Sequence, residues 1–225
     1  MNYKLNKRLL CAASFVERGA SVADIGCDHA YLPIYLIKEN IARSVVACDI
    51  NEGPCETARD NIRRQGLSDV IAVRCTDGLA GIEDFAPDDI VICGMGGDLI
   101  FRIVSESGYT KFKNPLLILQ PMTKVSELRS SLLRAGYNIE REALVYDDRL
   151  YEVIVCRYDG IKRAWSETEL LTGRYLDKND LYKAHIDKLI KQYMVIIEGK
   201  KKAGLDILKE EKLLEELQNE GNGII

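Results

Sequence analysis

The sequence contains few residues of the kinds that build metal sites. Its 225 residues include two histidines, His29 and His185, and neither has a second ligand at the usual metal-binding spacing. Seven cysteines are present, but no two form a Cys-x-x-Cys pair, and their number is odd. Several lie in strand-like apolar runs, which favours small buried thiols in a reducing compartment. We therefore expect no bound metal ion.

Long apolar runs are also missing. No stretch approaches the roughly 20 residues of a transmembrane helix, and the first residues lack the apolar core of a signal peptide. We therefore expect a cytoplasmic protein without a membrane partner. The composition leaves the oligomeric state open between a monomer and a weak dimer.

The chain lacks the basic excess that is common among non-specific nucleic-acid binders. It has 31 Lys and Arg against 35 Asp and Glu, a formal net charge of −4. Basic side chains nevertheless gather locally, for example at Lys4, Lys7 and Arg8 and at residues 200–202. A nucleic-acid partner would therefore be contacted through one or two small patches and not through an overall positive field.

Short apolar runs alternate with helical stretches over the first 160 residues. This alternation predicts a parallel sheet with helices on both faces. The expected strands are 21–26, 44–50, 70–75, 88–94 and 115–121, and the expected helices are 31–40, 56–66, 98–107 and 125–136.

Two further strand-like segments, 138–147 and 150–159, end this alternation. Only Asp148 and Arg149 separate them, which is too short for a parallel crossover and predicts an antiparallel hairpin. Five parallel strands followed by a late hairpin resemble the seven-stranded, Rossmann-like α/β fold of class I methyltransferases. Rossmann domains that bind nicotinamide cofactors lack this hairpin.

The apolar spacing becomes purely helical from about residue 165. Asp180 is a candidate N-cap for a long helix. The apolar stripe of this helix is Tyr182, Ile186, Leu189, Tyr193 and Ile196, and a second stripe is Leu205, Leu208, Leu213, Leu214 and Leu217. We therefore predict an α/β domain of residues 1–162 and a small coiled-coil-like helical domain of residues 163–225. These helices either cover one another or grip a long substrate.

Ligands of open parallel sheets bind beyond the carboxyl ends of the strands. The first predicted strand ends at Gly26, which permits a tight turn, and Asp28 and His29 follow. Asp49 follows the second strand, where a carboxylate can accept hydrogen bonds from ribose hydroxyls. Asp28 has a simpler alternative role as the cap of the next helix.

The next two strand ends carry similar features. Asp77 and Gly78 follow the third strand, and a carboxylate there can accept a hydrogen bond from an adenine amino group. The fourth strand ends in Gly94, Met95 and two further glycines, which free the backbone and place Met95 against a ligand. Each feature alone is as readily a turn or a cap, but all four in order indicate a nucleoside-like cofactor.

The fourth strand does not end in Asn/Asp-Pro-Pro-Tyr/Phe, the loop with which methyltransferases hold an exocyclic amine. A ring nitrogen such as N1 of adenine has an in-plane lone pair and needs positioning more than deprotonation. The sequence therefore favours an endocyclic nitrogen as the methyl acceptor.

Several motifs carry a more specific resemblance. They are DIGCDHAYLP at 24–33, DGL at 77–79, GMGG at 94–97, LQP at 119–121 and YEV at 151–153. Together they resemble the bacterial tRNA (adenine-22-N1)-methyltransferase family, from Leu5 to about Asp159 and more loosely beyond. The resemblance implies S-adenosylmethionine as cofactor, tRNA as partner and contact of both domains with the tRNA.

The resemblance also implies roles for individual residues. The residues expected to bind the cofactor are Gly26, Asp28, His29, Asp49, Asp77, Gly78, Gly94 and Met95. Asp28, His29 and Tyr31 are expected to be catalytic, and Tyr31, Gln120 and Pro121 to face the target adenine. The family pattern has Asn after Gln-Pro where this chain has Met122, so the task of that amide would fall to Gln120.

Three other functions fit parts of the pattern. A methyltransferase acting on a small molecule or on another RNA shares the fold and the cofactor. A non-catalytic RNA-binding protein on the same scaffold would not need the carboxylates and glycine loops that are present. A nicotinamide-dependent reductase conflicts with the single glycine of the first loop and with the hairpin.

Overall fold

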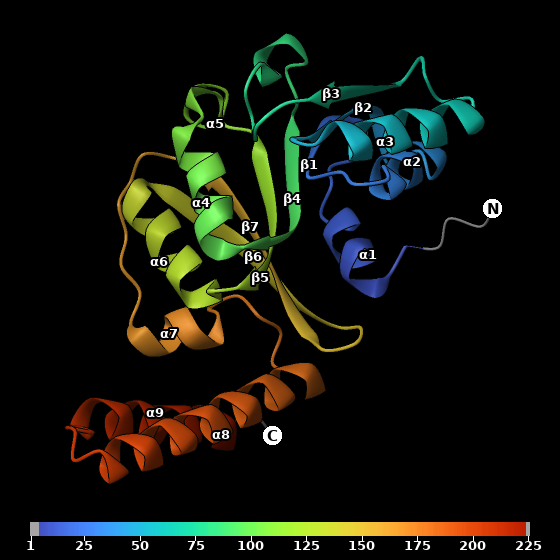
Figure 1. Ribbon diagram of the computed structural model, residues 1–225. Helices are drawn as coiled ribbons and strands as arrows, with labels where there is room; N and C mark the ends of the chain where they lie inside the picture. Colours follow the sequence, from blue (N-terminus) through green and yellow to red (C-terminus); the bar gives the residue numbers. More distant parts are fainter. Residues whose placement is uncertain (1–4, 224–225) are drawn as a thin grey trace.

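The computed structural model describes residues 5–223 and contains one seven-stranded sheet (Figure 1). The strands are β1 (Ala20–Ile25), β2 (Ala42–Asp49), β3 (Ile71–Cys75), β4 (Asp89–Gly96), β5 (Leu116–Thr123), β6 (Tyr137–Tyr146) and β7 (Leu150–Tyr158). Their order is β3-β2-β1-β4-β5-β7-β6. Neighbours among the first five are parallel, whereas β7 is antiparallel to β5 and β6. The predicted class I methyltransferase sheet and its hairpin are confirmed.

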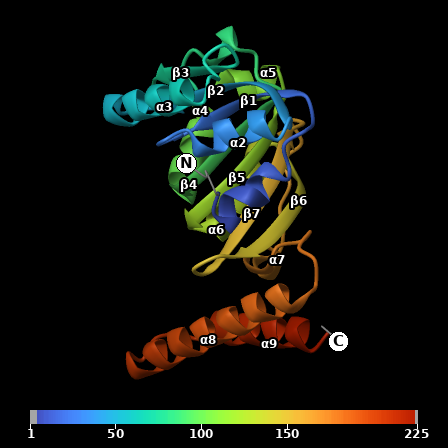
Figure 2. The same cartoon turned by 90° about the vertical axis from the view of Figure 1, so that its right-hand side faces the viewer.

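Three helices cover each face of the sheet (Figures 1 and 2). One face carries α1 (Lys7–Ala13), α2 (Tyr31–Lys38) and α3 (Glu52–Arg64), and the other α4 (Gly97–Glu106), α5 (Gly108–Phe112) and α6 (Val125–Ala135); a 3-10 turn, η1 (Ile82–Asp84), precedes β4. Side chains alternate along each strand, so Val22 packs under the first group and Ala23 under the second. Helix α3 begins four residues earlier than expected. Of the basic group Lys4, Lys7 and Arg8, the first residue lies outside the described residues.

The C-terminal part consists of α7 (Glu167–Thr172), α8 (Asp180–Lys202) and α9 (Leu208–Asn222). Asn179 is the N-cap of α8, because its side chain accepts hydrogen bonds from the amides of Leu181 and Tyr182, so the assignment of this cap to Asp180 was wrong by one position. None of the described helices combines the length and apolarity needed to cross a bilayer.

The end of the predicted apolar stripe also differs. Ile196 is 43% exposed, and Ile197 is buried instead. An α-helix has 3.6 residues per turn, so a buried face continues either three or four residues further on. Here Ile197, four positions after Tyr193, continues it. In the second stripe, Leu213 and Leu217 are buried, whereas Leu205 and Leu208 are exposed.

The pair formed by α8 and α9 docks at the carboxyl edge of the sheet. Strands β5 and β6 run in the same direction, because both are antiparallel to β7. Leu144 lies near the end of β6 and packs against the core of the helical pair, which includes Tyr182, Ile186 and Leu217. Figure 2 shows this pair standing apart from the layered domain. Trp165, just before α7, packs in the core beneath α6. The domain boundary at residues 162/163 stays a prediction.

A buried ion network joins the two parts. The Arg129 side chain is fully buried, and its Nε lies 2.6 Å from Glu142 Oε1 while Nη2 lies 2.5 Å from Glu152 Oε2. Nη1 donates to the carbonyl oxygen of Leu170 in α7. The second oxygen of Glu142 accepts hydrogen bonds from the amides of residues 174 and 175, in the link to α8. The network therefore ties α6, the hairpin and the helical region together.

Replacing Arg129 by Met should be strongly destabilising, because two carboxylates remain in a buried position without their counter-ion. We expect a loss of roughly 3–5 kcal/mol in the free energy of unfolding, measured by urea denaturation. Arg134→Met removes an exposed cation from the same helix and should change the free energy of unfolding by less than about 0.5 kcal/mol. Equal effects of the two substitutions would contradict this assignment.

Candidate cofactor and substrate site

The first and fourth strand ends touch each other. Gly26 has a φ of +78°, and a Cβ atom added there would lie 2.4 Å from the Cε atom of Met95. A side chain at position 26 would therefore be both strained and in collision with Met95. The glycine loop and the Gly94-Met95 segment thus form one continuous surface, as the sequence predicted.

The loop after Gly26 contains two non-glycine residues in the left-handed region, Asp28 with φ +50° and Ala30 with φ +58°. Ala30 is the N-cap residue of α2, and no side chain caps this helix. The alternative role of Asp28 as a helix cap is therefore wrong. The amide of Asp28 instead donates to Asp49 Oδ2 at 3.3 Å, which joins the loop to the end of β2.

Asp28, His29 and Tyr31 lie together at the mouth of this loop. His29 Nε2 lies 3.6 Å from Asp28 Oδ1, and the rings of His29 and Tyr31 are 5.4 Å apart between centroids. The His29 carbonyl accepts a hydrogen bond from Asn61 Nδ2, which anchors the loop. His29 Nδ1 is buried and has no hydrogen-bond partner in the described part of the chain. Asp28 and Tyr31 are exposed.

Asp24, near the end of β1, is a site residue that the sequence reasoning missed. It is 4% exposed, and burial together with the nearby charge of Asp49 raises its pKa to about 7. The carboxyl groups of Asp24 and Asp49 thus lie close together at neighbouring strand ends. A signal was present, because an acidic residue stands among the apolar residues Val22, Ala23 and Ile25 of this strand.

Asp77 and Gly78 follow β3 at the next strand end in the sheet. They line a cavity of about 330 Å³ together with Leu79, Arg102 and Ile103. Asp77 is exposed and lies 4.0 Å from Arg102. The amide of Thr76, just before it, donates to the carbonyl oxygen of Asp49, so the second and third strand ends are joined.

Gln120 is fully buried at the end of β5. Its Oε1 accepts from Arg8 Nη1 at 2.5 Å and from the Gly94 amide at 3.2 Å, while Nε2 donates to the Pro121 carbonyl oxygen and contacts Met122 Sδ at 3.8 Å. A direct contact with a base would require some of these bonds to break. In this conformation the Gln120 amide therefore faces Arg8, Gly94 and Pro121 and not a ligand. Pro121 is buried and lies opposite Met95 in the ladder.

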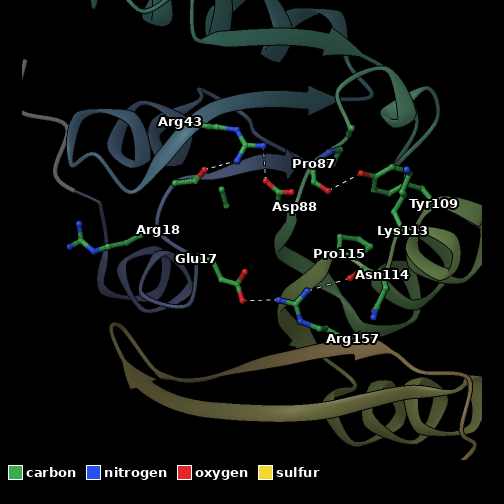
Figure 3. A pocket seen from close by; sticks show the side chains of 13 residues that line it. Glu17, Arg18, Arg43, Pro87, Asp88, Tyr109, Lys113, Asn114, Pro115 and Arg157 are labelled. Atoms are coloured by element: carbon green, nitrogen blue, oxygen red, sulfur yellow. Dashed lines mark hydrogen bonds and ion pairs between the residues drawn. The ribbon is translucent and has the colours of Figure 1, made fainter.

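A separate cavity of about 500 Å³ lies at the opposite, amino edge of the sheet (Figure 3). Four of its charged side chains form two ion pairs, since Arg43 lies 2.8 Å from Asp88 and Arg157 lies 2.7 Å from Glu17. None of the predicted site residues lines it. In residues 5–223, no three His, Cys, Asp or Glu side chains form a potential metal cluster.

Comparison with known proteins identifies the family. A family model described as a methyltransferase domain matches residues 5–154. The chain is 38% identical over 184 residues to the tRNA (adenine(22)-N(1))-methyltransferase of Bacillus subtilis. The aligned region covers 78% of this chain and 76% of that protein. The chain belongs to the tRNA (adenine-22-N1)-methyltransferase family.

Solved structures of this family have the same fold. A Streptococcus pneumoniae putative tRNA (m1A22) methyltransferase in complex with S-adenosyl-L-methionine superposes with a TM-score of 0.83 at 32% identity, covering 95% of this chain and 99% of that one. Mycoplasma capricolum TrmK in complex with S-adenosyl-homocysteine gives 0.82 at 27% identity, covering 98% and 99%. The helical pair is thus part of the shared architecture.

The residues present fit S-adenosylmethionine, which is a sulfonium cation with a nucleoside at one end. Asp24 and Asp49 form no ion pair within residues 5–223, so their charges suit a cationic ligand. The buried Nδ1 of His29 lacks a partner that a polar ligand can supply. Gly26 keeps the loop free of side chains where a ligand must approach closely.

The raised pKa of Asp24 makes stability depend on pH. The folded state holds this proton more tightly than the unfolded chain, so the free energy of unfolding should fall as pH rises from about 4 to about 7. Asp24→Asn should remove this part of the slope in urea titrations at pH 5 and pH 8 without cofactor. Asp89, whose pKa burial raises to about 6, leaves a smaller slope of the same sign. An unchanged slope in Asp24→Asn would exclude the assignment.

Proposed function

We propose that this protein transfers the methyl group of S-adenosylmethionine to N1 of adenine 22 in tRNA, in the cytoplasm. The observation that most supports this proposal is that Asp28, His29 and Tyr31 lie together beside Asp49, at the strand ends that suit the cofactor. Membership of the family supports the same substrate, because the B. subtilis relative is named for this reaction.

The cofactor supplies an electrophilic methyl group on a positively charged sulfur when it is bound. N1 of adenine loses no proton on methylation, so the protein needs to place the ring and has no need of a strong general base. The positive charge moves onto the adenine during the transfer. A fixed carboxylate beside that ring favours the charged product, and Asp28 is placed for this task.

Each predicted residue has a role in this proposal. Tyr31 provides an aromatic surface on which the target base stacks, an interaction worth ~1–3 kcal/mol. Asp28, held by contact with His29, accepts a hydrogen bond from the adenine amino group of the target. Asp49 binds the cofactor ribose and Asp77 the cofactor adenine. The backbone at Gly26, Gly78 and Gly94 and the side chain of Met95 line the cofactor, and Gln120 and Pro121 act on the base indirectly, by positioning the Gly94-Met95 segment.

The helical pair of α8 and α9 provides a second contact with tRNA in this proposal. It docks at the same edge of the sheet as the site, through Leu144. Lys188 and Lys191 lie on α8, along an open groove of that helix, and neither forms an ion pair within residues 5–223. Unpaired cations on an extended helix suit the phosphate backbone of a folded RNA.

Incubation with labelled S-adenosylmethionine and a purified tRNA tests the function. We expect 1-methyladenosine as the labelled nucleoside, and no label in a matched tRNA whose adenine 22 is replaced by guanine. Label in a different nucleoside would redirect the proposal to another RNA position. A second incubation replaces the tRNA by the small molecules of a cell extract. Label in these molecules, together with an unlabelled tRNA in the first incubation, would favour the small-molecule alternative.

Asp28→Asn should slow methyl transfer by ~10- to 100-fold, because it removes the carboxylate charge and keeps the shape. Asn adopts the left-handed region at least as readily as Asp, so the loop at φ +50° should be retained. Cofactor affinity by calorimetry and the melting temperature should stay nearly unchanged. Asp60→Asn, which changes an exposed carboxylate on α3, is the matched control. Full activity of Asp28→Asn would reject its electrostatic role.

A further inference from the structure

The ladder between β4 and β5 is interrupted at Gly94. Cys93 pairs with Gln120 and Met95 with Pro121, so Gly94 has no partner across the ladder. Its φ is +83°, and its amide donates to Gln120 Oε1. A bulge of this kind changes the direction of the following side chain. That side chain is Met95, which packs against Gly26 in the glycine loop.

Arg8 determines which end of the Gln120 amide faces Gly94. A guanidinium can only donate hydrogen bonds, and Arg8 Nη1 lies 2.5 Å from Gln120 Oε1. If the amide flipped, its NH2 group would face two donors, the guanidinium and the Gly94 amide. The flip would also remove the donor from the carbonyl oxygen of Pro121. Arg8 thus keeps an acceptor in front of the Gly94 amide.

The position of Arg8 is itself well defined. Its Nη1 would lie 3.5 Å from a Cβ atom at Gly94, and its guanidinium carbon is 5.8 Å from the centre of the Tyr151 ring. No carboxylate within residues 5–223 forms an ion pair with it. The charge of Arg8 is therefore directed to Gln120 and the bulge, across 112 residues of sequence.

We propose that Arg8 is a positioning residue for methyl transfer. Through Gln120 it fixes the bulge at Gly94, and the bulge holds Met95 against the glycine loop that binds the cofactor. Arg8 touches neither the methyl donor nor the target base in this arrangement. The activity part of this inference rests on the proposed function, whereas the arrangement of Arg8, Gln120 and Gly94 does not.

The test compares Arg8→Met with Lys7→Met, which removes the same charge from the neighbouring, exposed position on α1. The first readout is hydrogen exchange of the Gly94 amide in the cofactor-free protein, followed by NMR. We expect exchange at least ~10-fold faster in Arg8→Met, because the amide loses a fixed acceptor. Lys7→Met should match the wild type.

The second readout separates kcat from KM for tRNA. Arg8→Met should lower kcat by about 10-fold and change KM by less than about 2-fold, and Arg8→Lys, which retains a donor, should recover most of the loss. In a Gln120→Leu background, Arg8→Met should cause no further decrease, because the two residues act as one unit.

A raised KM with unchanged kcat and unchanged Gly94 exchange would overturn the proposal and make Arg8 a phosphate contact. Unchanged values throughout would overturn it as well. If Arg8→Met does not fold, Gln120→Leu, which removes the acceptor and keeps Arg8, carries the same expectations for exchange and kcat, and a wild-type result there overturns the proposal. Failure of the wild-type protein to methylate tRNA would reject the proposed function, while the exchange measurement would still decide the arrangement.

Discussion

The buried guanidinium of Arg129 is the contact on which the relative placement of the sheet and the helical region depends. Two carboxylates share one cation, and the excess negative charge is offset by amides at the start of the link to α8. Such a group gains little net stability over a well-packed apolar cluster. It does, however, allow only one arrangement, because every hydrogen bond has a defined direction. The helical pair is thereby held at the edge of the sheet where the site lies.

Charge is distributed unevenly around that edge. Asp24, Asp28 and Asp49 converge on the cofactor side, which suits a sulfonium ligand but repels the phosphates of an RNA. Cations without an ion pair in the described residues lie elsewhere, at Lys188 and Lys191 on α8. This separation explains how a chain of net charge −4 can serve an anionic substrate.

Local patterns in the sequence were sufficient for the sheet, because period-two and period-3.6 spacing and a two-residue turn are local properties. The same patterns placed Gly26, Asp49 and Gly94 at strand ends. They failed where one residue decides between neighbours, as at Asn179 against Asp180 or Ile197 against Ile196. They also could not assign Arg8, since its partner Gln120 is distant in sequence and its own segment is an ordinary basic helix. The alternative of a helix cap at Asp28 was wrong because the loop adopts left-handed conformations that a helical pattern does not reveal.

The attachment of α1 has a consequence for the order of assembly. Arg8 bonds to Gln120, and Glu17, just after α1, pairs with Arg157 across 140 residues. During synthesis, α1 leaves the ribosome before β5 and the hairpin do, so these two contacts form only after Gln120 and Arg157 have been made. Closing such long loops is slow, and partly made chains expose the edge of β4 meanwhile. The arrangement of Arg8, Gln120 and Gly94 is thus completed only after β5 has been made, so a chain interrupted before β5 cannot carry it.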